Sequence, residues 1–194
     1  MEYRTAQVIL TECNWLNPLS RLISASEGSP ITHSFIVTGQ NLAVEASWPR
    51  VHKFSLSDHL SHMTEHDQAY VVLDIPELTD DDRRKVAAKA ESYIGRWYDI
   101  GQALLYALTH KFWNDGTGTL LCSRLVTAAF YSGLDLSLFP EVVLTAQFAD
   151  SPKLDNLRSG YATPADLLRS KLTVVGFSPS SRFHSVEELT ATKK

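Results

Sequence analysis

The segment from residue 31 to residue 47 constrains the fold most, because it predicts two antiparallel strands. Residues 31–38 (Ile-Thr-His-Ser-Phe-Ile-Val-Thr) are rich in the β-branched and aromatic residues that strands favour. A turn signal, Gly-Gln-Asn, follows at residues 39–41, and residues 42–47 form the return strand. Strands joined by so short a connection run antiparallel, since parallel strands need a long crossover.

The remaining elements are predicted from hydrophobic spacing and capping residues. Apolar, β-rich runs predict strands at residues 6–11, 51–55, 69–75 and 172–177. Helices are predicted at residues 79–94, 98–112 and 122–133, with a short one that begins at Thr163-Pro164. Strands that precede helices, with one closing strand, predict an α+β fold with an antiparallel sheet.

Four segments lack a clear element. Residues 15–30 and 114–119 are expected to be loops, residues 57–68 a short polar helix or loop, and residues 137–160 irregular or weakly helical. The last of these is either a lid over a cleft or plain packing. The polar tail, residues 178–194, is expected to be loose.

The composition is that of an ordinary globular protein. The chain has 194 residues, 44% hydrophobic and 21% charged, which predicts one domain over residues 1–177. The net charge is −4 and no basic patch stands out, so nucleic acid is not an expected partner. No cofactor is expected.

Compartment and redox state are predicted from what the sequence lacks. There is no run of about 18 apolar residues that would span a membrane. The N-terminal residues lack the basic-then-apolar plan of a signal peptide, so a cytoplasmic location is expected. Cys13 and Cys122 would be free thiols in a reducing compartment, and only the fold decides whether they can pair.

Cys122 is the strongest candidate for chemistry. It stands at the predicted first turn of a helix whose apolar face follows at helical spacing, namely Leu125, Val126, Ala129 and Phe130. The positive end of a helix dipole and its unpaired N–H groups favour a thiolate and can hold an oxyanion. The alternative is a small buried hydrophobe, because free cysteine is among the most buried residue types.

A thiol nucleophile needs a base and an orienting group, and the hairpin offers both. His33 alternates with Ile31, Phe35 and Val37, so all four are predicted on one face. Glu45 on the return strand is predicted across the ladder, near the level of His33 or Phe35. The alternatives are a satisfied core histidine and an exposed glutamate, and a register shift of one residue would turn Glu45 to the other face.

His59, His62 and His66 follow i, i+3, i+7 spacing and would share one face of a helix. Three imidazoles on one face can hold zinc. The alternative is a solvated segment, since no ligand motif accompanies the three histidines.

The order of these motifs resembles the circularly permuted branch of the papain-like NlpC superfamily, the YiiX-like group. The resemblance rests on Ser-Pro-Ile-Thr-His33-Ser-Phe-Ile-Val, Val-Glu45-Ala, Gly-Arg-Trp-Tyr98-Asp, Leu-Leu-Cys122-Ser-Arg-Leu-Val and Thr163-Pro164-x-Asp-Leu-Leu. It spans about residues 6–177, and the order and spacing of the short motifs carry it.

The resemblance implies a single papain-like domain in which the sheet packs against the helix that carries the cysteine. By the same resemblance Cys122 is the nucleophile, His33 the base, Glu45 the orienting group and Tyr98 a contributor to the oxyanion site. Two positions depart from the family pattern. Leu121 stands where unpermuted relatives often have aspartate, and Ser34 where a small or apolar residue is common.

Two further residues are predicted to contact substrate. Ser123 follows the cysteine and lacks the G-x-S-x-G frame of a serine nucleophile, so it is assigned to the oxyanion or substrate site. Trp48 is expected to line the cleft, although aromatic residues are more often part of the core.

The expected function is that of a cysteine-dependent amidase or peptidase with an acyl-enzyme intermediate. By the resemblance, the substrate is an amide of the peptidoglycan-cross-bridge or isopeptide type. One alternative is a lipid or thioester acyltransferase or hydrolase on the same fold. A papain-like binding module without turnover and a metal-binding protein are the others.

Overall fold

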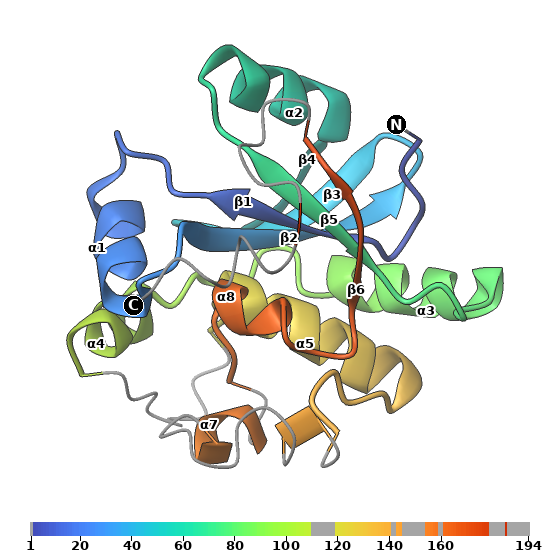
Figure 1. Cartoon of the computed structure of the whole chain (residues 1–194). Helices are drawn as coiled ribbons and strands as arrows, with labels where there is room; N and C mark the ends of the chain where they lie inside the picture. Colours follow the sequence, from blue (N-terminus) through green and yellow to red (C-terminus); the bar gives the residue numbers. More distant parts are fainter. Residues whose placement is uncertain are drawn as a thin grey trace.

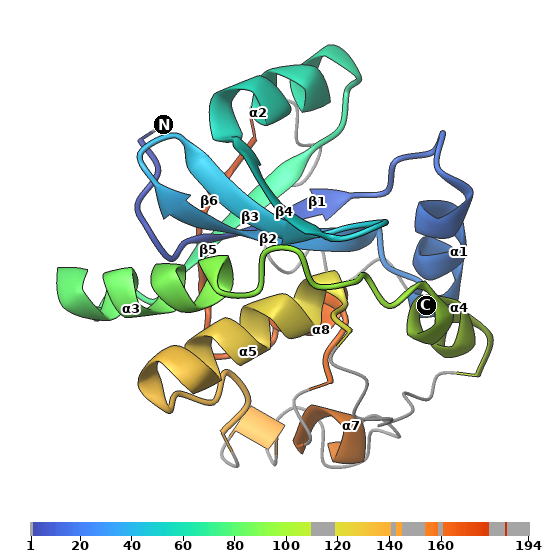
Figure 2. The same cartoon turned by 180° about the vertical axis from the view of Figure 1, so that it is seen from behind.

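The computed structural model describes residues 2–109, 119–140, 143–144, 154–158, 161–178 and 185. The fold is mixed α+β, built on a six-stranded antiparallel sheet in the order β4-β3-β2-β1-β5-β6 (Figures 1 and 2). The strands are β1 Val8–Glu12, β2 Ile31–Gly39, β3 Leu42–Ala46, β4 Val51–Ser55, β5 Tyr70–Asp74 and β6 Thr173–Phe177. The helices are α1 Pro18–Glu27, α2 Leu56–Glu65, α3 Asp80–Glu91, α4 Ile100–Thr109, α5 Cys122–Leu134, α7 Leu154–Arg158 and α8 Pro164–Leu167.

Helices cover both faces of the sheet. One apolar cluster joins β1, β2 and β5 to α3, α5 and α8, with Phe130 and Leu167 among its fully buried members. A second cluster lies between the other face and α2, with Phe35 at its centre. Figure 1 shows α2 on one side of the sheet and α3 and α5 on the other. The predicted α+β fold with an antiparallel sheet is confirmed.

The predicted hairpin is confirmed, and its register places Glu45 directly opposite Phe35. The prediction that Ile31 shares the face of Phe35 and Val37 is wrong. The pairing between β1 and β2 shifts by one residue after Thr11, so Ile31 packs in the cluster of α5, whereas Phe35 and Val37 pack under α2. A bulge of this kind reverses the alternation that a regular strand would keep.

Helix α1 was predicted as a loop, and that prediction is wrong. Asn17 caps the helix, because its side chain accepts a hydrogen bond from the N–H of Leu19 at 3.0 Å, and Pro18 occupies the first turn. Gly28 ends the helix in the left-handed region, at φ 57°. Asparagine, proline and glycine also mark turns, so the residues that cap this helix favour a loop when they are considered one by one.

Residues 57–68, predicted as a short polar helix or loop, form most of α2. The helix is not polar all round, because Leu56, Leu60 and Met63 are buried at helical spacing against the sheet. His59 and His62 therefore belong to a helix with one apolar face, and His66 is its C-cap.

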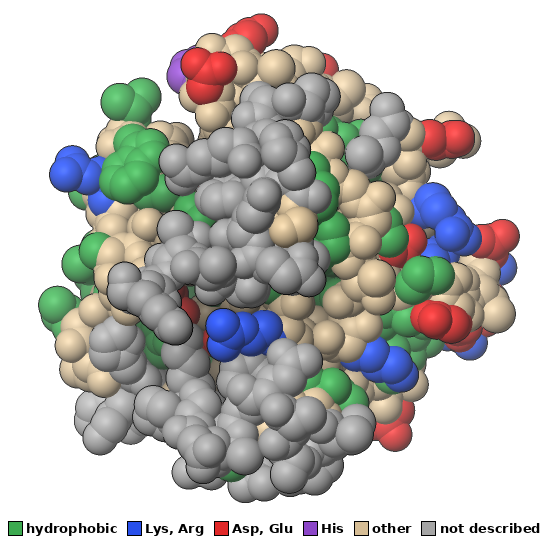
Figure 3. Space-filling view, viewed as in Figure 1, with side chains coloured by type: hydrophobic (Ala, Val, Ile, Leu, Met, Phe, Trp, Pro, Cys, Tyr) green, Lys and Arg blue, Asp and Glu red, His purple; other side chains and the backbone are tan. Residues whose placement is uncertain are grey.

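Helix α3 begins with a capping box, in which Thr79 and Asp82 each bond the other's backbone N–H. It ends at Glu91, three residues before the predicted Ile94, and a series of turns follows. Gly95 has φ +88°, and its N–H donates to the carbonyl of Val51 at 2.9 Å. Acidic and basic side chains alternate over this side of the molecule in Figure 3, typical of a solvated face.

A buried ion pair joins β5 to α3. Arg83 and Asp74 are 3% and 4% exposed, and Arg83 Nη1 lies 2.7 Å from Asp74 Oδ1. The guanidinium also donates to the backbone carbonyls of Thr5 and Ile75, and Gln7 donates to the other carboxylate oxygen. This network fixes the start of α3 against the sheet.

Helices α3 and α5 pack closely because Gly133 lacks a side chain. A Cβ at this position would lie 3.2 Å from the carbonyl oxygen of Lys85 and 3.3 Å from the Cα of Val86. Contacts that short require the neighbouring backbone to move. Helix α5 runs one residue beyond the predicted Gly133, to Leu134, and Asp135 follows at φ 55°.

Several predictions fall partly outside the described residues. The helix predicted at residues 98–112 is described only to Thr109. The loop predicted at residues 114–119 is described only at Thr119. Within the segment 137–160, Leu138 and Phe139 are buried in the core cluster of α5. Of the predicted tail only Ser178 and Ser185 are described, and Ser178 is bound to Tyr70 of the sheet. None of the described helices is long and apolar enough to cross a bilayer.

Candidate active site

Cys122 is the first residue of α5, as predicted, and it is 5% exposed. The preceding Leu121 stands at the N-cap position and offers no side-chain hydrogen bond to the helix. The first backbone N–H groups of the helix are therefore left without the usual cap. Cys13 is buried as well, and both cysteines are free thiols.

His33 and Glu45 come together from neighbouring strands. His33 Nε2 lies 2.6 Å from Glu45 Oε2, and the two side chains are 24% and 10% exposed. Because this contact uses Nε2, the other ring nitrogen of His33, Nδ1, remains for its hydrogen bond with Cys122. The structure thus brings together the three residues that the sequence predicted as nucleophile, base and orienting group.

The charges of this trio are coupled. Burial alone would lower the pKa of His33, but the charge and hydrogen bond of Cys122, and then those of Glu45, raise it to about 10. Burial would raise the pKa of the Cys122 thiol, yet the charge and hydrogen bond of His33 lower it overall. Burial would also raise the pKa of the Glu45 carboxyl, but the charge of His33 holds that pKa well below its usual range. The arrangement favours a thiolate–imidazolium pair.

Ser34 is a site residue that the sequence analysis treated only as a departure from a family pattern. It is fully buried on β2, and its proximity to Cys122 lowers the pKa of the thiol further. The signal in the sequence for this role was that Ser34 follows His33 directly. A strand that places the imidazole near the thiol also places the next residue near it.

Tyr98 is held beside Cys122 by backbone pairing. Its N–H donates to the carbonyl of Pro49 at 3.0 Å, and it forms a parallel bridge with Leu120. Burial raises the pKa of Tyr98 well above its usual value, and the charge of Cys122 adds to the shift. The phenol therefore keeps its proton and can donate a hydrogen bond at neutral pH.

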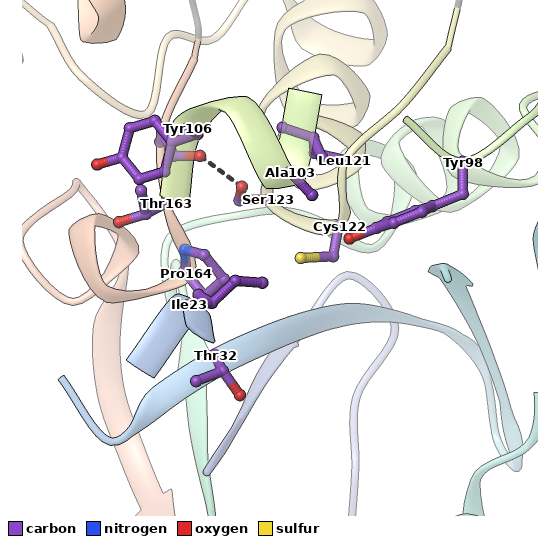
Figure 4. A pocket seen from close by; sticks show the side chains of 11 residues that line it. Ile23, Thr32, Tyr98, Ala103, Tyr106, Leu121, Cys122, Ser123, Thr163 and Pro164 are labelled. Carbon is purple, nitrogen blue, oxygen red and sulfur yellow. Dashed lines mark hydrogen bonds between the residues drawn. The ribbon is translucent and has the colours of Figure 1, made fainter. Parts of the chain in front are cut away.

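A narrow apolar cavity of about 30 Å³ opens beside the thiol (Figure 4). In Figure 4 the ring of Tyr98 lies on one side of Cys122, and Pro164 and Ile23 lie on the other. Elements α1, β2, α4, the start of α5 and the start of α8 contribute the lining, namely Ile23, Thr32, Ala103, Tyr106, Leu121, Ser123, Ala162, Thr163 and Pro164.

The other two predicted contact residues lie differently. The hydroxyl of Ser123 donates to the backbone carbonyl of Ala162, so it anchors the segment before α8 while its side chain also lines the cavity. Trp48 stands in the turn between β3 and β4, is 69% exposed and is not among the cavity residues. Exposed Trp97 lies nearby in the bridge to Arg50, whose guanidinium is 4.0 Å from its ring.

The three histidines of α2 do not converge. His59 packs edge-on against Phe35 and lies 4.7 Å from the ring of Phe54. His62 and His66 stack on each other, with ring centroids 4.3 Å apart. Among the residues that the structure describes, no three His, Cys, Asp or Glu side chains are placed to hold a metal ion.

Comparisons with known proteins show a likeness in structure only. No family model matches the chain, and the search of curated proteins found no match. The crystal structure of the metalloprotein YiiX from Escherichia coli O157:H7 is similar, with a TM-score of 0.63 and 19% sequence identity. The match covers 91% of this chain and 98% of that one. The chain therefore has a YiiX-like fold, in which helices pack on a six-stranded antiparallel sheet.

Proposed function

We propose that the protein is a cysteine-dependent hydrolase that cleaves an amide bond through an acyl-enzyme. One observation carries the proposal: Glu45 lies 2.6 Å from His33, and Cys122 and His33 have pKa values shifted in opposite directions. A buried thiol whose pKa is lowered by an oriented imidazole is the recurring form of a nucleophilic cysteine.

The reaction follows from the charges of the three residues. Cys122 Sγ attacks the carbonyl carbon and forms a C–S bond, while an electron pair moves to the carbonyl oxygen. The N–H of Cys122 and the phenol of Tyr98 stabilise that oxyanion. As the C–N bond breaks, the imidazolium of His33 gives its proton to the leaving amine. Glu45 holds the ring in place throughout.

The second half restores the enzyme. Neutral His33 takes a proton from water, and the hydroxide attacks the thioester carbon. The C–S bond breaks, the carboxylic acid leaves, and the thiolate–imidazolium pair is regained. Every proton passes through His33, so one residue serves as acid and then as base.

The cavity beside Cys122 limits the acyl part of the substrate. At about 30 Å³ it is far smaller than the roughly 300–1,000 Å³ of pockets that enclose drug-sized ligands. It suits a small apolar group, such as the side chain of alanine next to the scissile carbonyl of a peptide or isopeptide. Because its wall is apolar, a short acyl ester or thioester is the second candidate substrate class.

An activated ester tests the chemistry without knowledge of the natural substrate. With p-nitrophenyl acetate we expect a burst of p-nitrophenolate equal to the enzyme concentration, and a mass increase of one acetyl group on Cys122. Cys122→Ala removes both signals, His33→Ala slows the burst, and Cys13→Ser changes neither. Acetylation that occurs equally on Cys13 and Cys122 would overturn the proposal.

The same assay separates the two substrate classes. Hydrolysis of N-acetyl-alanine p-nitroanilide, in which the scissile bond is an amide, supports an amidase. Turnover of acetyl thioesters without any amide cleavage supports the second class, because amide cleavage requires protonation of a poorer leaving group.

A further inference from the structure

Glu45 has a second histidine partner. His52 lies on β4 directly opposite Glu45 in the β3–β4 ladder. Its Nε2 is 3.2 Å from Glu45 Oε1, the oxygen that His33 does not use. The two carboxylate oxygens thus face one imidazole each, from strands on either side of β3.

Contacts at both nitrogens fix the orientation of the His52 ring. Nδ1 lies 3.2 Å from the backbone carbonyl of Arg50, while Nε2 faces the carboxylate. Both partners are hydrogen-bond acceptors, so the ring satisfies both contacts when both nitrogens carry protons. Ser47 adds a third donor to the carboxylate, from its hydroxyl to Glu45 Oε1 at 3.1 Å.

The carboxylate of Glu45 depends on these donors for its position. A glutamate side chain has three rotatable bonds, and a single hydrogen bond to His33 leaves the plane of its carboxylate free to rock about the Cγ–Cδ bond. A donor on Oε1 removes that freedom, because it fixes the plane of the carboxylate. The short contact with His33 can then persist through the proton transfers of the reaction.

We propose that His52 is a positioning residue for the reaction, which holds Glu45 in the plane that orients His33. This inference rests on the proposed function of Cys122 and His33. Nothing in it requires His52 to touch the substrate, although its side chain is 49% exposed beside the site.

The charge of His52 also bears on the site. The hydrogen bond to Glu45 is the largest influence on the pKa of His52 and raises it, although burial and the charge of His33 oppose the shift. Charged or titratable groups that face it are Glu45 on β3, His33 on β2 and His59 on α2. When His52 is charged it repels the imidazolium of His33 and so disfavours it. By holding Glu45 in place, His52 favours the same imidazolium, so its electrostatic and its geometric effects oppose each other.

Two substitutions separate these effects. His52→Ala removes the donor and the charge, whereas His52→Gln keeps an N–H donor without the charge. His62→Ala is the matched control, because it removes an exposed histidine of α2 that makes no contact with Glu45. The measurement is the rate of iodoacetamide alkylation of Cys122 against pH, read by mass spectrometry, with the urea midpoint of each variant measured beside it.

We expect His52→Ala to raise the pKa of Cys122 by about one unit, which lowers its alkylation about tenfold on the acidic limb. His52→Gln, which keeps the donor and loses the repelling charge, should hold the pKa of Cys122 at or below its wild-type value, and His62→Ala should not move it. A role in stability alone would shift the urea midpoint of His52→Ala and leave the profile in place, and that result would overturn the inference. If wild-type Cys122 reacts no faster than equally buried Cys13, the proposed function itself fails.

Discussion

Glu45 Oε2 and His33 Nε2 lie 2.6 Å apart although the two residues are not ladder partners, since Glu45 stands opposite Phe35. They are diagonal neighbours, and diagonal side chains are farther apart than directly opposed ones. The glutamate side chain is long enough to bridge the extra distance. An aspartate at this position would be one methylene shorter and would leave the imidazole without its partner.

Glu45→Gln tests this contact. Glutamine keeps the length of the side chain but loses the charge that stabilises the imidazolium, so hydrolysis of p-nitrophenyl acetate should fall by about 10²-fold or more. Glu91→Gln is the control, since Glu91 pairs with Lys53 at 2.6 Å on the half-exposed surface. Equal rates in the two variants would remove Glu45 from the mechanism.

The pH dependence of hydrolysis and of alkylation should differ at high pH. The pKa of Cys122 is lowered, so both activities are lost only as the pH falls through that value, below the usual thiol pKa of about 8.5. The pKa of His33 is raised to about 10, so above that pH the leaving group loses its proton donor. Hydrolysis of N-acetyl-alanine p-nitroanilide, whose leaving amine needs that proton, should therefore decline near pH 10 while alkylation of Cys122 stays fast. Parallel decline of both rates would contradict this assignment.

Asp74→Ala should destabilise the fold by about 3–5 kcal/mol, because it leaves the guanidinium of Arg83 buried without its counter-ion. Asp81→Ala provides the comparison, since Asp81 pairs with Lys85 at 2.7 Å on the exposed face of α3. That change should cost much less, because solvent screens an exposed ion pair. Urea unfolding followed by circular dichroism measures both values, and similar costs would show that the buried network contributes little.

Ser123→Ala should lower the free energy of unfolding by about 1–3 kcal/mol. The hydroxyl of Ser123 donates to the carbonyl of Ala162, and in this buried place water does not replace it. The expected loss is one of stability, measured by urea unfolding. An unchanged midpoint, together with slower acylation of Cys122, would instead return Ser123 to the substrate-contact role predicted from the sequence.

Two capping boxes offer a matched pair of substitutions. Thr79 caps α3 on the surface, whereas Thr163 caps α8 in the interior and lies within hydrogen-bond distance of Glu27 and Asp166. Thr79→Ala should cost about 1 kcal/mol. Thr163→Ala should cost about 2 kcal/mol, because its partner Asp166 is buried. Thermal unfolding of the two variants checks whether Thr163→Ala is destabilised more than Thr79→Ala.

The β-hairpin and the start of α5 were predictable because local signals determine them. The turn at residues 39–41 fixes the pairing of β2 and β3, and that pairing alone brings Glu45 close to His33. Helical spacing after Cys122 fixes its place in the first turn. These two elements contain the residues proposed as nucleophile, base and orienting group, so most of the candidate site followed from short-range patterns.

The remaining features depend on contacts between distant segments. The bulge after Thr11 turns Ile31 to the opposite face, and no signal in β2 itself announces it. The partnership of His52 with Glu45 depends on the β3–β4 register, and that of Ser34 with Cys122 on how α5 meets the sheet. The segment of α1 was misread because its capping residues are those of a turn.

Gly133 and Cys122 lie near opposite ends of one stiff helix, about 16.5 Å apart at the usual rise per residue. A methyl group at Gly133 would press on the backbone of Lys85 and Val86, and a rigid rod that is pushed at one end swings at the other. Such a swing would move the Cys122 sulfur relative to the imidazole of His33, and a misplacement of about 1 Å between reacting groups can cost about 10²-fold in rate. The position of the Cys122 sulfur thus depends on Gly133, at the far end of α5, which touches none of the residues proposed to react.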